Sequence, residues 1–327
     1  MTHRITLAVL AYKQASFIDA AVHSALGQVC EPVEIMLSDD ASPDGSFERM
    51  QALAEAYRGP HQVVLRRNPH NLGVGEHYNA IVREARGELI VTMAGDDISL
   101  PQRVQLTAKA WDASAGRLDL IACDLIDMSH DGEDLGIIRV DDLAEWPDIN
   151  AWARRRPYIV GAGHAFTRRL FDRFGPLQPE LAYEDQILTL RAIVSGGAAT
   201  IRQPLVRYRR GGLSGRMREF SGAHYIAWTK RHNQQYIAQH AQWLADAQTA
   251  GHLETVASAT LHERTRELFM QDLLSAQSVV SRWRALRAHD VLGFGWRLRK
   301  LLYWQWPALA AAVRRWQSSW KLRRNKA

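Results

Sequence analysis

Residues 1–126 repeat one pattern, in which a short apolar run is followed by turn residues and then by a helical pattern. The apolar runs are RITLAVLAY, VEIMLSD, HQVVLRRN, ELIVTMAGDD and LDLIACDLID. They are continuous rather than alternating, and helical patterns separate them, which is typical of parallel strands buried on both faces. We therefore expect an α/β fold with a mainly parallel sheet and helices on both of its faces.

The pattern changes along the rest of the chain. Residues 127–216 combine a hairpin, a strand that leads into a helix, and a last strand, and we expect them to complete the same domain as residues 1–126. Residues 217–290 are helical in pattern, and residues 291–327 form a basic, tryptophan-rich tail. The predicted organisation is therefore one domain over 1–216, a helical C-terminal region and the tail.

Length and composition limit the class of protein. A chain of 327 residues can bury an ample core without disulfides. Its two cysteines have neither a disulfide framework nor metal-site spacing, which suits a reducing cytoplasm. The first residues read as a strand rather than a signal peptide, and no apolar run reaches the ~18 residues of a membrane span. We expect a cytoplasmic protein that is soluble or peripheral on a membrane.

Paired carboxylates follow two of the predicted strands, Asp39-Asp40 after VEIML and Asp96-Asp97 after ELIVTM. Ligands of such sheets bind at the carboxyl ends of the strands, so both pairs should lie at one edge. Adjacent carboxylates repel each other unless donors or a cation meet them. A nucleotide diphosphate with Mg²⁺ or Mn²⁺ fits, because these ions take one or two protein carboxylates together with phosphate and water.

A plainer interpretation covers the other polar residues of SDDASPDGS. Ser42, Asp44 and Ser46 are typical turn and N-cap residues, and each could accept a backbone N–H at the start of the next helix. This interpretation does not account for two adjacent carboxylates, Asp39 and Asp40.

Six segments, taken in order, resemble the signature blocks of family 2 glycosyltransferases of the GT-A fold. They are AVLAYKQASFIDAAVHSALGQ, SDDASPDGS, RNPHNLGVGEHYNAIVREARGELIVTMAGDDISLPQRV, GAGHAFTRRLFDRFGPL, YEDQILTLRA and LVRYRRGGLSGR. The resemblance covers about residues 4–216 and extends to relatives that build bacterial surface polysaccharides. It implies a catalytic domain with a nucleotide-binding half, 1–126, and an acceptor half, 127–216.

The resemblance also implies roles for individual residues. Asp185 matches the general base of inverting members, and Asp96 with Asp97 matches the end of the family's metal and diphosphate motif. The residues expected to bind the nucleotide sugar are Ala11, Tyr12, Asp39, Asp40, Asn71, Gly73 and Asp96. Those expected on the acceptor side are Gly163, His164 and Glu184, although His164 could equally serve in packing.

The chemistry of Asp185 suits this role. An inverting transfer needs a base that takes the proton of the acceptor hydroxyl while its oxygen attacks the anomeric carbon. A partly desolvated carboxylate beside Glu184 would have its pKa raised toward the useful range. Asp185 could also cap the helix that follows it, and capping is compatible with catalysis.

Two departures from the family pattern concern the metal. Ala94 stands where an aspartate is usual, and Gly211 stands where many members have a histidine. Arg209, Arg210 and Arg216 could neutralise phosphate instead, or they could form a solvated basic loop.

The tail is basic and aromatic. Residues 281–327 hold twelve Lys and Arg against one acid, Asp290, and six of the eleven tryptophans of the chain. Leu309, Val313, Trp316 and Trp320 follow a helical spacing and would form one apolar face. Such a helix suits the headgroup region of an anionic membrane, although it could also pack on protein. No nucleic-acid-binding module accompanies the charge.

These observations predict an inverting glycosyltransferase. It would move a sugar from a UDP-, dTDP- or GDP-type donor to a glycan or lipid-linked acceptor at the inner face of the plasma membrane. The helical region 217–290 could contribute a homodimer contact. The alternative is a catalytically silent relative that binds nucleotide sugar or serves as a scaffold, an alternative suggested by Ala94 and Gly211.

Overall fold

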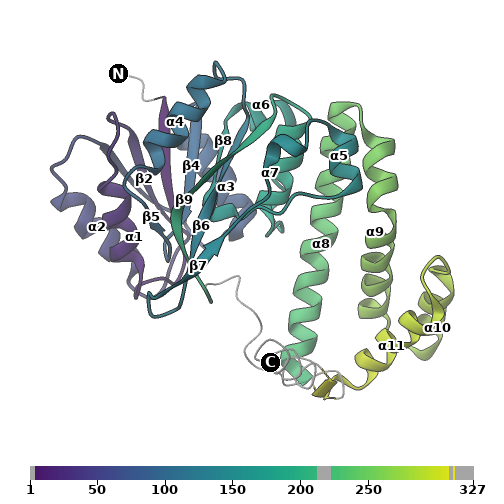
Figure 1. Ribbon diagram of the computed structural model, residues 1–327. Coiled ribbons are helices and arrows are strands. Elements are labelled where there is room, and N and C mark those ends of the chain that lie inside the picture. The colour runs from purple at the N-terminus through teal and green to yellow at the C-terminus, as the bar shows by residue number, and fades with distance from the viewer. Residues whose placement is uncertain (1–3, 212–221, 309–311, 314–327) are drawn as a thin grey trace. The chain divides into compact units, whose positions relative to one another are not determined.

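The computed structural model describes residues 4–211, 222–308 and 312–313 (Figure 1). The chain divides into two compact units. Unit 1 comprises Met1–Ser214 and Gln242–Val256, and unit 2 comprises Gly215–Ala241 and Ala257–Ala327.

Unit 1 is built on a mixed sheet with the strand order β3-β2-β1-β4-β8-β6-β9-β5, and β7 pairs with β6. Its first four strands are parallel: β1 (Ile5–Ala11), β2 (Glu34–Asp39), β3 (Gln62–Arg67) and β4 (Leu89–Ala94). The others are β5 (Ile98–Ser99), β6 (Leu120–Met128), β7 (Asp134–Ile138), β8 (His164–Thr167) and β9 (Ala198–Arg209). The predicted α/β class is confirmed, with β8 antiparallel to both β4 and β6.

Helices cover both faces of this sheet because successive strand residues point to opposite sides. Leu7 and Val9 pack with one set of helices: α1 (Ile18–Leu26), α2 (Ser46–Ala56) and α4 (Arg103–Ala113). Ala8 packs on the other side, with α3 (Gly73–Glu84), α5 (Ile149–Arg154), α6 (Arg169–Phe174) and α7 (Glu184–Ile193). The 3-10 turns η1 (Leu143–Glu145) and η2 (Gly161–Gly163) lie in the connections. Strands that are apolar on both faces therefore read as continuous runs in the sequence.

Two long helices follow, α8 (Gly222–Ala250) and α9 (Leu253–Ser275), and the turn between them belongs to unit 1. Trp243 meets Trp152 edge to face, with the ring centroids 5.2 Å apart. Asp246 accepts hydrogen bonds from Arg191 of α7 at 2.7 and 3.0 Å, and both side chains are almost fully buried. The chain thus returns to the first domain after the predicted boundary at residue 216, and it does so through packing and a buried ion pair.

Unit 2 consists of helices in its described part: the first part of α8, most of α9, α10 (Val279–Ala288) and α11 (Phe294–Gln305). Its core is formed by side chains of α9, α10, α11 and the segment between α10 and α11: Phe269, Met270, Leu273, Ala285, Leu286, Leu292, Trp296, Leu301 and Trp304. Of the apolar face predicted over 309–320, Leu309, Trp316 and Trp320 lie outside the described residues. No helix in the described ranges is long and apolar enough to cross a membrane.

Candidate functional site

The carboxyl ends of the four parallel strands meet at one edge of the sheet. Asp39 of β2 is paired with Ala11 of β1, and Leu10 is paired with Ala94 of β4. Just beyond these ends, the N–H of Asp40 donates to the carbonyl of Ala11 at 2.9 Å. The strand order reverses between β1 and β4, which is where sheets of this kind form a ligand crevice. Both carboxylate pairs therefore follow strands that end at this edge, as predicted.

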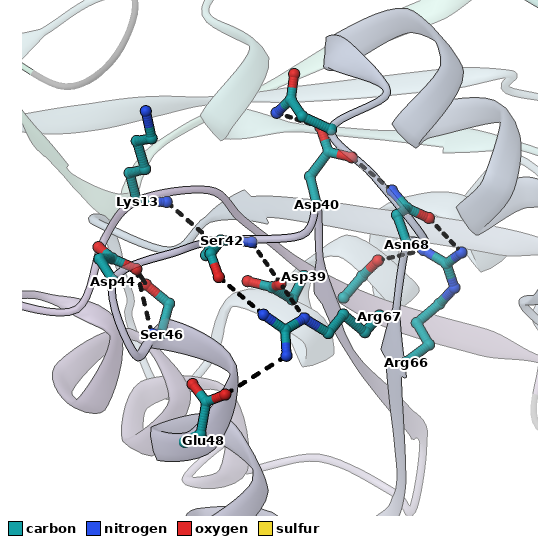
Figure 2. Close-up of polar contacts among 12 residues, drawn as sticks. Lys13, Asp39, Asp40, Ser42, Asp44, Ser46, Glu48, Arg66, Arg67 and Asn68 are labelled. Carbon is teal, nitrogen blue, oxygen red and sulfur yellow. Dashed lines mark hydrogen bonds and ion pairs between the residues drawn. The ribbon is translucent and has the colours of Figure 1, made fainter.

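The Asp40 carboxylate accepts hydrogen bonds from four protein donors, of which Asn68 is labelled in Figure 2. The side chains of Asn68 and Asn71 donate to it at 2.7 and 3.1 Å, and the N–H groups of Leu72 and Gly73 donate at 2.8 and 3.0 Å. Gly73 begins α3 with a φ of +79°, a conformation that favours glycine. The negative charge also suits a helix N-terminus. Asp40 thus holds Asn71 and Gly73, both predicted binding residues, in one loop.

Asp39 is differently placed. Its Oδ2 accepts from the N–H of Ser42 at 2.8 Å and lies 3.4 Å from Nε of Arg67 (Figure 2). Its Oδ1 is buried and has no partner in the described part of the chain. Of the carboxylate oxygens of Asp39 and Asp40, Oδ1 of Asp39 is therefore the acceptor that remains for a ligand.

The three residues expected to cap α2 serve mainly the neighbouring loop. Ser42 Oγ and Ser46 Oγ accept from the N–H groups of Lys13 and Gln14, each at 3.0 Å. Asp44 accepts from the N–H of Ala15 at 3.1 Å and, at the start of α2, from that of Ser46 at 3.2 Å. The N-cap position itself is Gly45. The capping expectation is therefore correct for Asp44 alone, because the loop after β1 has N–H groups in reach of the other two.

Asp96 and Asp97 are also buried at this edge. Asp97 Oδ1 accepts from the N–H of Arg209 at 2.8 Å, and Oδ2 has no partner among the described residues. Burial raises the pKa of both carboxyls, and the charge of Asp96 raises the pKa of Asp97 further, to well above its usual range. Two carboxylates in this state favour a cation or a proton between them.

Arg209, the last residue of β9, does not belong to a solvated loop. The buried Arg209 donates from Nε to the carbonyl of Asp96 at 2.9 Å and from Nη1 to that of His130 at 2.6 Å. Its guanidinium lies 4.4 Å from the ring centroid of Phe17. Arg210 forms an ion pair with Asp127. Arg216 lies outside the described residues. The solvated alternative is therefore wrong for Arg209, whose hydrogen bonds are to protein carbonyls.

The donor set at Asp96 and Asp97 fits a divalent cation with oxygen ligands. Mg²⁺ and Mn²⁺ take one or two protein carboxylates and complete their shell with phosphate and water, and Asp97 has a buried oxygen without a protein partner. No group of three or more His, Cys, Asp or Glu side chains suited to a metal occurs among residues 4–211, 222–308 and 312–313. The oxygens of Asp96 and Asp97 therefore suit an ion whose remaining ligands come from phosphate and water.

A second acidic pair, Glu184 and Asp185, lies in the first turn of α7. Glu184 Oε1 accepts from the Tyr78 hydroxyl at 3.2 Å. A Cβ at Gly161 would stand 2.4 Å from the same oxygen, so a larger residue there would force the Glu184 carboxyl to move. Asp185 Oδ1 accepts from the N–H of Gln186 at 2.7 Å.

The two acids of α7 have different pKa values. Burial raises the pKa of Glu184 to about 8, and the neighbouring charge of Asp185 adds to this. Burial raises the pKa of Asp185 to about 6, against hydrogen bonds that lower it. Near neutral pH, Asp185 is thus mainly ionised while Glu184 is mainly protonated. A charged acceptor of protons beside a neutral acid is a usual arrangement for general base chemistry.

Helix α3 connects the strand edge with this acidic pair. It begins at Gly73, which Asp40 holds, and it carries Tyr78, which binds Glu184. The N–H of Gly75 donates to the carbonyl of Leu181 at 3.1 Å, and a Cβ at Gly75 would lie 2.4 Å from the carbonyl oxygen of Gln178. The loop before α7 is therefore packed closely on the first turn of α3.

Some predicted residues are enclosed by protein. His164 is 1% exposed, packs against the rings of Tyr78 and Phe166, and has a pKa lowered by burial to about 3. This neutral, buried state favours the packing alternative. Gly163 is buried, and a Cβ there would lie 3.1 Å from the carbonyl oxygen of Cys123. Ala11 is buried at the end of β1, and Tyr12 is half-buried just after it.

Sequence reasoning missed three side chains that hold the site together: Asn68, Tyr78 and Arg103. Arg103 is 1% exposed and donates from Nη2 to the carbonyls of Thr92 and Ala162, each at 2.8 Å, which ties β4 to the loop before β8. Its spacing from Thr107 and Trp111, four and eight residues on, could have placed it on the buried face of α4.

Comparison with known proteins identifies the relatives of this chain. Residues 6–134 match the profile of the family described as Glycosyl transferase family 2. Succinoglycan biosynthesis protein ExoO of Rhizobium meliloti is 28% identical over 224 residues, which cover 64% of this chain and 62% of that protein. Putative glycosyltransferase EpsH of Bacillus subtilis is 26% identical over 221 residues, covering 64% and 61%. The matches thus span about three fifths of these relatives.

Solved structures share the fold. S. aureus TarS in complex with UDP has a TM-score of 0.54 at 15% identity, covering 87% of this chain and 78% of that one. Mannosyltransferase PcManGT from Pyrobaculum calidifontis, in complex with GDP-Man and Mn²⁺, has a TM-score of 0.52 at 16% identity, covering 96% and 87%. The unit 1 sheet with its helices is thus of the GT-A type, and a helical C-terminal region follows it.

Proposed function

We propose that this chain, whose residues 6–134 match the profile of glycosyl transferase family 2, transfers a sugar, with inversion, from a nucleotide-diphosphate sugar to an acceptor hydroxyl. The observation that carries this proposal is the acidic pair of α7. Asp185 has a pKa of about 6, next to a glutamate that stays protonated at neutral pH. This is the protonation state that a base for an acceptor hydroxyl requires.

The donor would bind at the carboxyl edge of β1, β2 and β4. Asp39 Oδ1 is the acceptor available for a base N–H or a ribose hydroxyl, and Tyr12 lies at the end of the adjacent strand. Asp40 would act through the loop that holds Asn71 and Gly73 beside the nucleoside. Relatives of this fold bind UDP, UDP-GlcNAc and GDP-Man, which supports a UDP-, dTDP- or GDP-type donor.

Asp96 and Asp97 would hold Mg²⁺ or Mn²⁺ together with the diphosphate. When bound, the ion supplies Lewis-acid stabilisation of the leaving diphosphate. The backbone N–H of Arg209 fixes one oxygen of Asp97, so the second oxygen is oriented without further rearrangement. A neighbour of this fold binds Mn²⁺ with its donor, which supports the assignment of the cofactor.

On the acceptor side, Asp185 would take the proton of the attacking hydroxyl at its carboxylate. Glu184 would be protonated and would accept a hydrogen bond from Tyr78, which fixes its position next to Asp185. Because it is neutral, Glu184 would not place a second negative charge beside the Asp185 carboxylate. Gly161 leaves the space that the Glu184 carboxyl needs. Gly163 and His164 would shape this side from within the protein rather than touch the acceptor.

We further propose that the acceptor is a glycan or a lipid-linked sugar used in bacterial surface polysaccharide synthesis, with the enzyme peripheral on the inner face of the plasma membrane. A relative named for succinoglycan biosynthesis supports this setting.

The test is turnover of a panel of nucleotide sugars by the full chain and by the Asp185→Asn variant. We expect transfer or slow donor hydrolysis in the native chain and a loss of about 10²-fold or more in the variant, with donor binding retained. Asp172→Asn is the matched control, because Asp172 is an exposed aspartate in the first turn of α6. Donor binding without turnover under any condition would instead support the catalytically silent alternative suggested by Ala94 and Gly211.

A further inference from the structure

Helices α10 and α11 of unit 2 expose large apolar side chains in an unusual concentration. We call these residues the α10–α11 outer surface. They are Val279, Val280 and Trp283 on α10, Val291 between the helices, Phe294, Leu298 and Leu302 on α11, and Trp306 just after it. Trp283, Phe294 and Trp306 are each 55% exposed. Single exposed apolar residues need no explanation, but a concentration of this kind marks an interaction surface.

The exposed residues of α11 are not a poorly packed part of the core. Phe294, Leu298 and Leu302 follow one another at intervals of four and share one side of the helix. Away from this row, Trp296 and Trp304 pack on the core of unit 2, and Leu301, at the margin of the row, packs there as well. Helix α11 is therefore apolar on two sides, only one of which has a protein partner among the described residues.

Cations accompany these apolar residues. Residues 279–308 contain six Lys or Arg and one acid, Asp290. Arg284, Arg287 and Arg299 are exposed, and no carboxylate in the described part of the chain pairs with them. Their charge is available to an outside partner.

We propose that the α10–α11 outer surface docks on an anionic lipid bilayer. Aromatic and aliphatic side chains would enter the boundary between headgroups and acyl chains, while the arginines beside them would contact lipid phosphates. A second copy of this chain fits less well, because joining two such surfaces would bring their unpaired cations together. The inference concerns unit 2 and does not depend on the proposed transferase activity.

Vesicle binding of the full chain tests this proposal directly. The probes are phosphatidylcholine vesicles with and without about a quarter phosphatidylglycerol, at low and high salt. We expect binding to the anionic vesicles, weakened by salt, and little binding to pure phosphatidylcholine. The double variant Leu298→Asp/Leu302→Asp should bind anionic vesicles about tenfold more weakly or worse, because each carboxylate would enter the apolar boundary and face anionic lipid.

A matched pair on α9 serves as the control. Leu261 and Leu268 are 49% and 37% exposed, and Leu298 and Leu302 are each 37% exposed. The variant Leu261→Asp/Leu268→Asp therefore introduces the same charge at positions of similar exposure. This control should bind vesicles within about twofold of the native chain. Arg284→Gln/Arg287→Gln provides a second variant at exposed positions, and it should reduce the preference for anionic over neutral vesicles.

Three results would overturn the proposal. The α9 pair could lose binding as much as the α11 pair, or all variants could bind anionic vesicles as the native chain does. In the third result, the native chain would not bind vesicles. It would instead form a dimer in solution, and the double variant Leu298→Asp/Leu302→Asp would dissociate this dimer. Donor binding, measured in parallel, should be the same in all variants, so that a failure of this proposal is distinguishable from a failure of the transferase proposal.

Discussion

Replacing Glu184 with glutamine should stabilise the protein at alkaline pH and have a smaller effect at acid pH. Burial raises the folded-state pKa of Glu184 from 4.5 to about 8. The folded state therefore binds more protons than the unfolded state between these two pH values, and stability falls as the pH rises through this window. Glutamine does not ionise, so this loss is absent from the variant.

The magnitude follows from the size of the shift. A rise in the pKa from 4.5 to about 8 corresponds to roughly 5 kcal/mol if it is expressed in full. Glu184 keeps part of its surface in contact with solvent, which screens the charge of its ionised form. We therefore expect the unfolding free energy of Glu184→Gln, relative to that of the native protein, to rise by about 2 kcal/mol from pH 5 to pH 9.

Urea denaturation at pH 5, 7 and 9 measures this effect, with the native protein and the variant compared at each pH. Glu133→Gln is the control, since it makes the same substitution at an exposed glutamate. If the unfolding free energies of the native protein and Glu184→Gln differed by the same amount at pH 5 and at pH 9, Glu184 would already be ionised in the folded protein at neutral pH. The account of a neutral acid beside Asp185 would then be refuted.

Two further changes test other parts of the structure. Arg191→Met leaves the buried Asp246 without its partner and should cost about 3–5 kcal/mol of unfolding free energy in urea denaturation. Arg191→Met/Asp246→Leu should recover most of this loss, and no recovery would mean that the loss does not come from the unpaired Asp246 carboxylate. Gly161→Ala would place a Cβ 2.4 Å from Glu184 Oε1 and displace this carboxyl. It should lower kcat on the order of 10²-fold with little change in the donor KM. An unchanged kcat would show that the position of Glu184 does not affect the reaction.

Most of the fold can be predicted from the sequence because both faces of β1, β2 and β4 are buried. Every position of β2 is buried, and helical patterns between the strands indicate parallel pairing. The position of the two acidic pairs at the strand edge then follows from topology alone. What the pattern does not contain is the return of residues 242–256 to unit 1, because Asp246 reads as an ordinary polar position on a long helix.

The roles of neighbouring carboxylates were harder to predict, because they depend on which donors the loops bring to each oxygen. Asp39 and Asp40 are adjacent in the sequence, but Asp40 accepts four hydrogen bonds while Oδ1 of Asp39 accepts none within the described residues. Likewise, the sequence gives no sign that Tyr78 would bind Glu184, 106 residues away. Such pairings arise from tertiary packing, which periodicity does not specify.

The position of α3 suggests why the donor edge and the acidic pair of α7 belong to one site. A donor that contacts the loop of Asn71 and Gly73 would meet groups already fixed by Asp40, and the same helix fixes Glu184 through Tyr78. Any shift of α3 along its axis would therefore disturb both ends, because its first turn is also held by Gly75 against Leu181. Group transfer between two bound substrates requires that their sites keep a fixed separation. A single helix anchored at Gly73 and at Tyr78 provides this without a separate linking element.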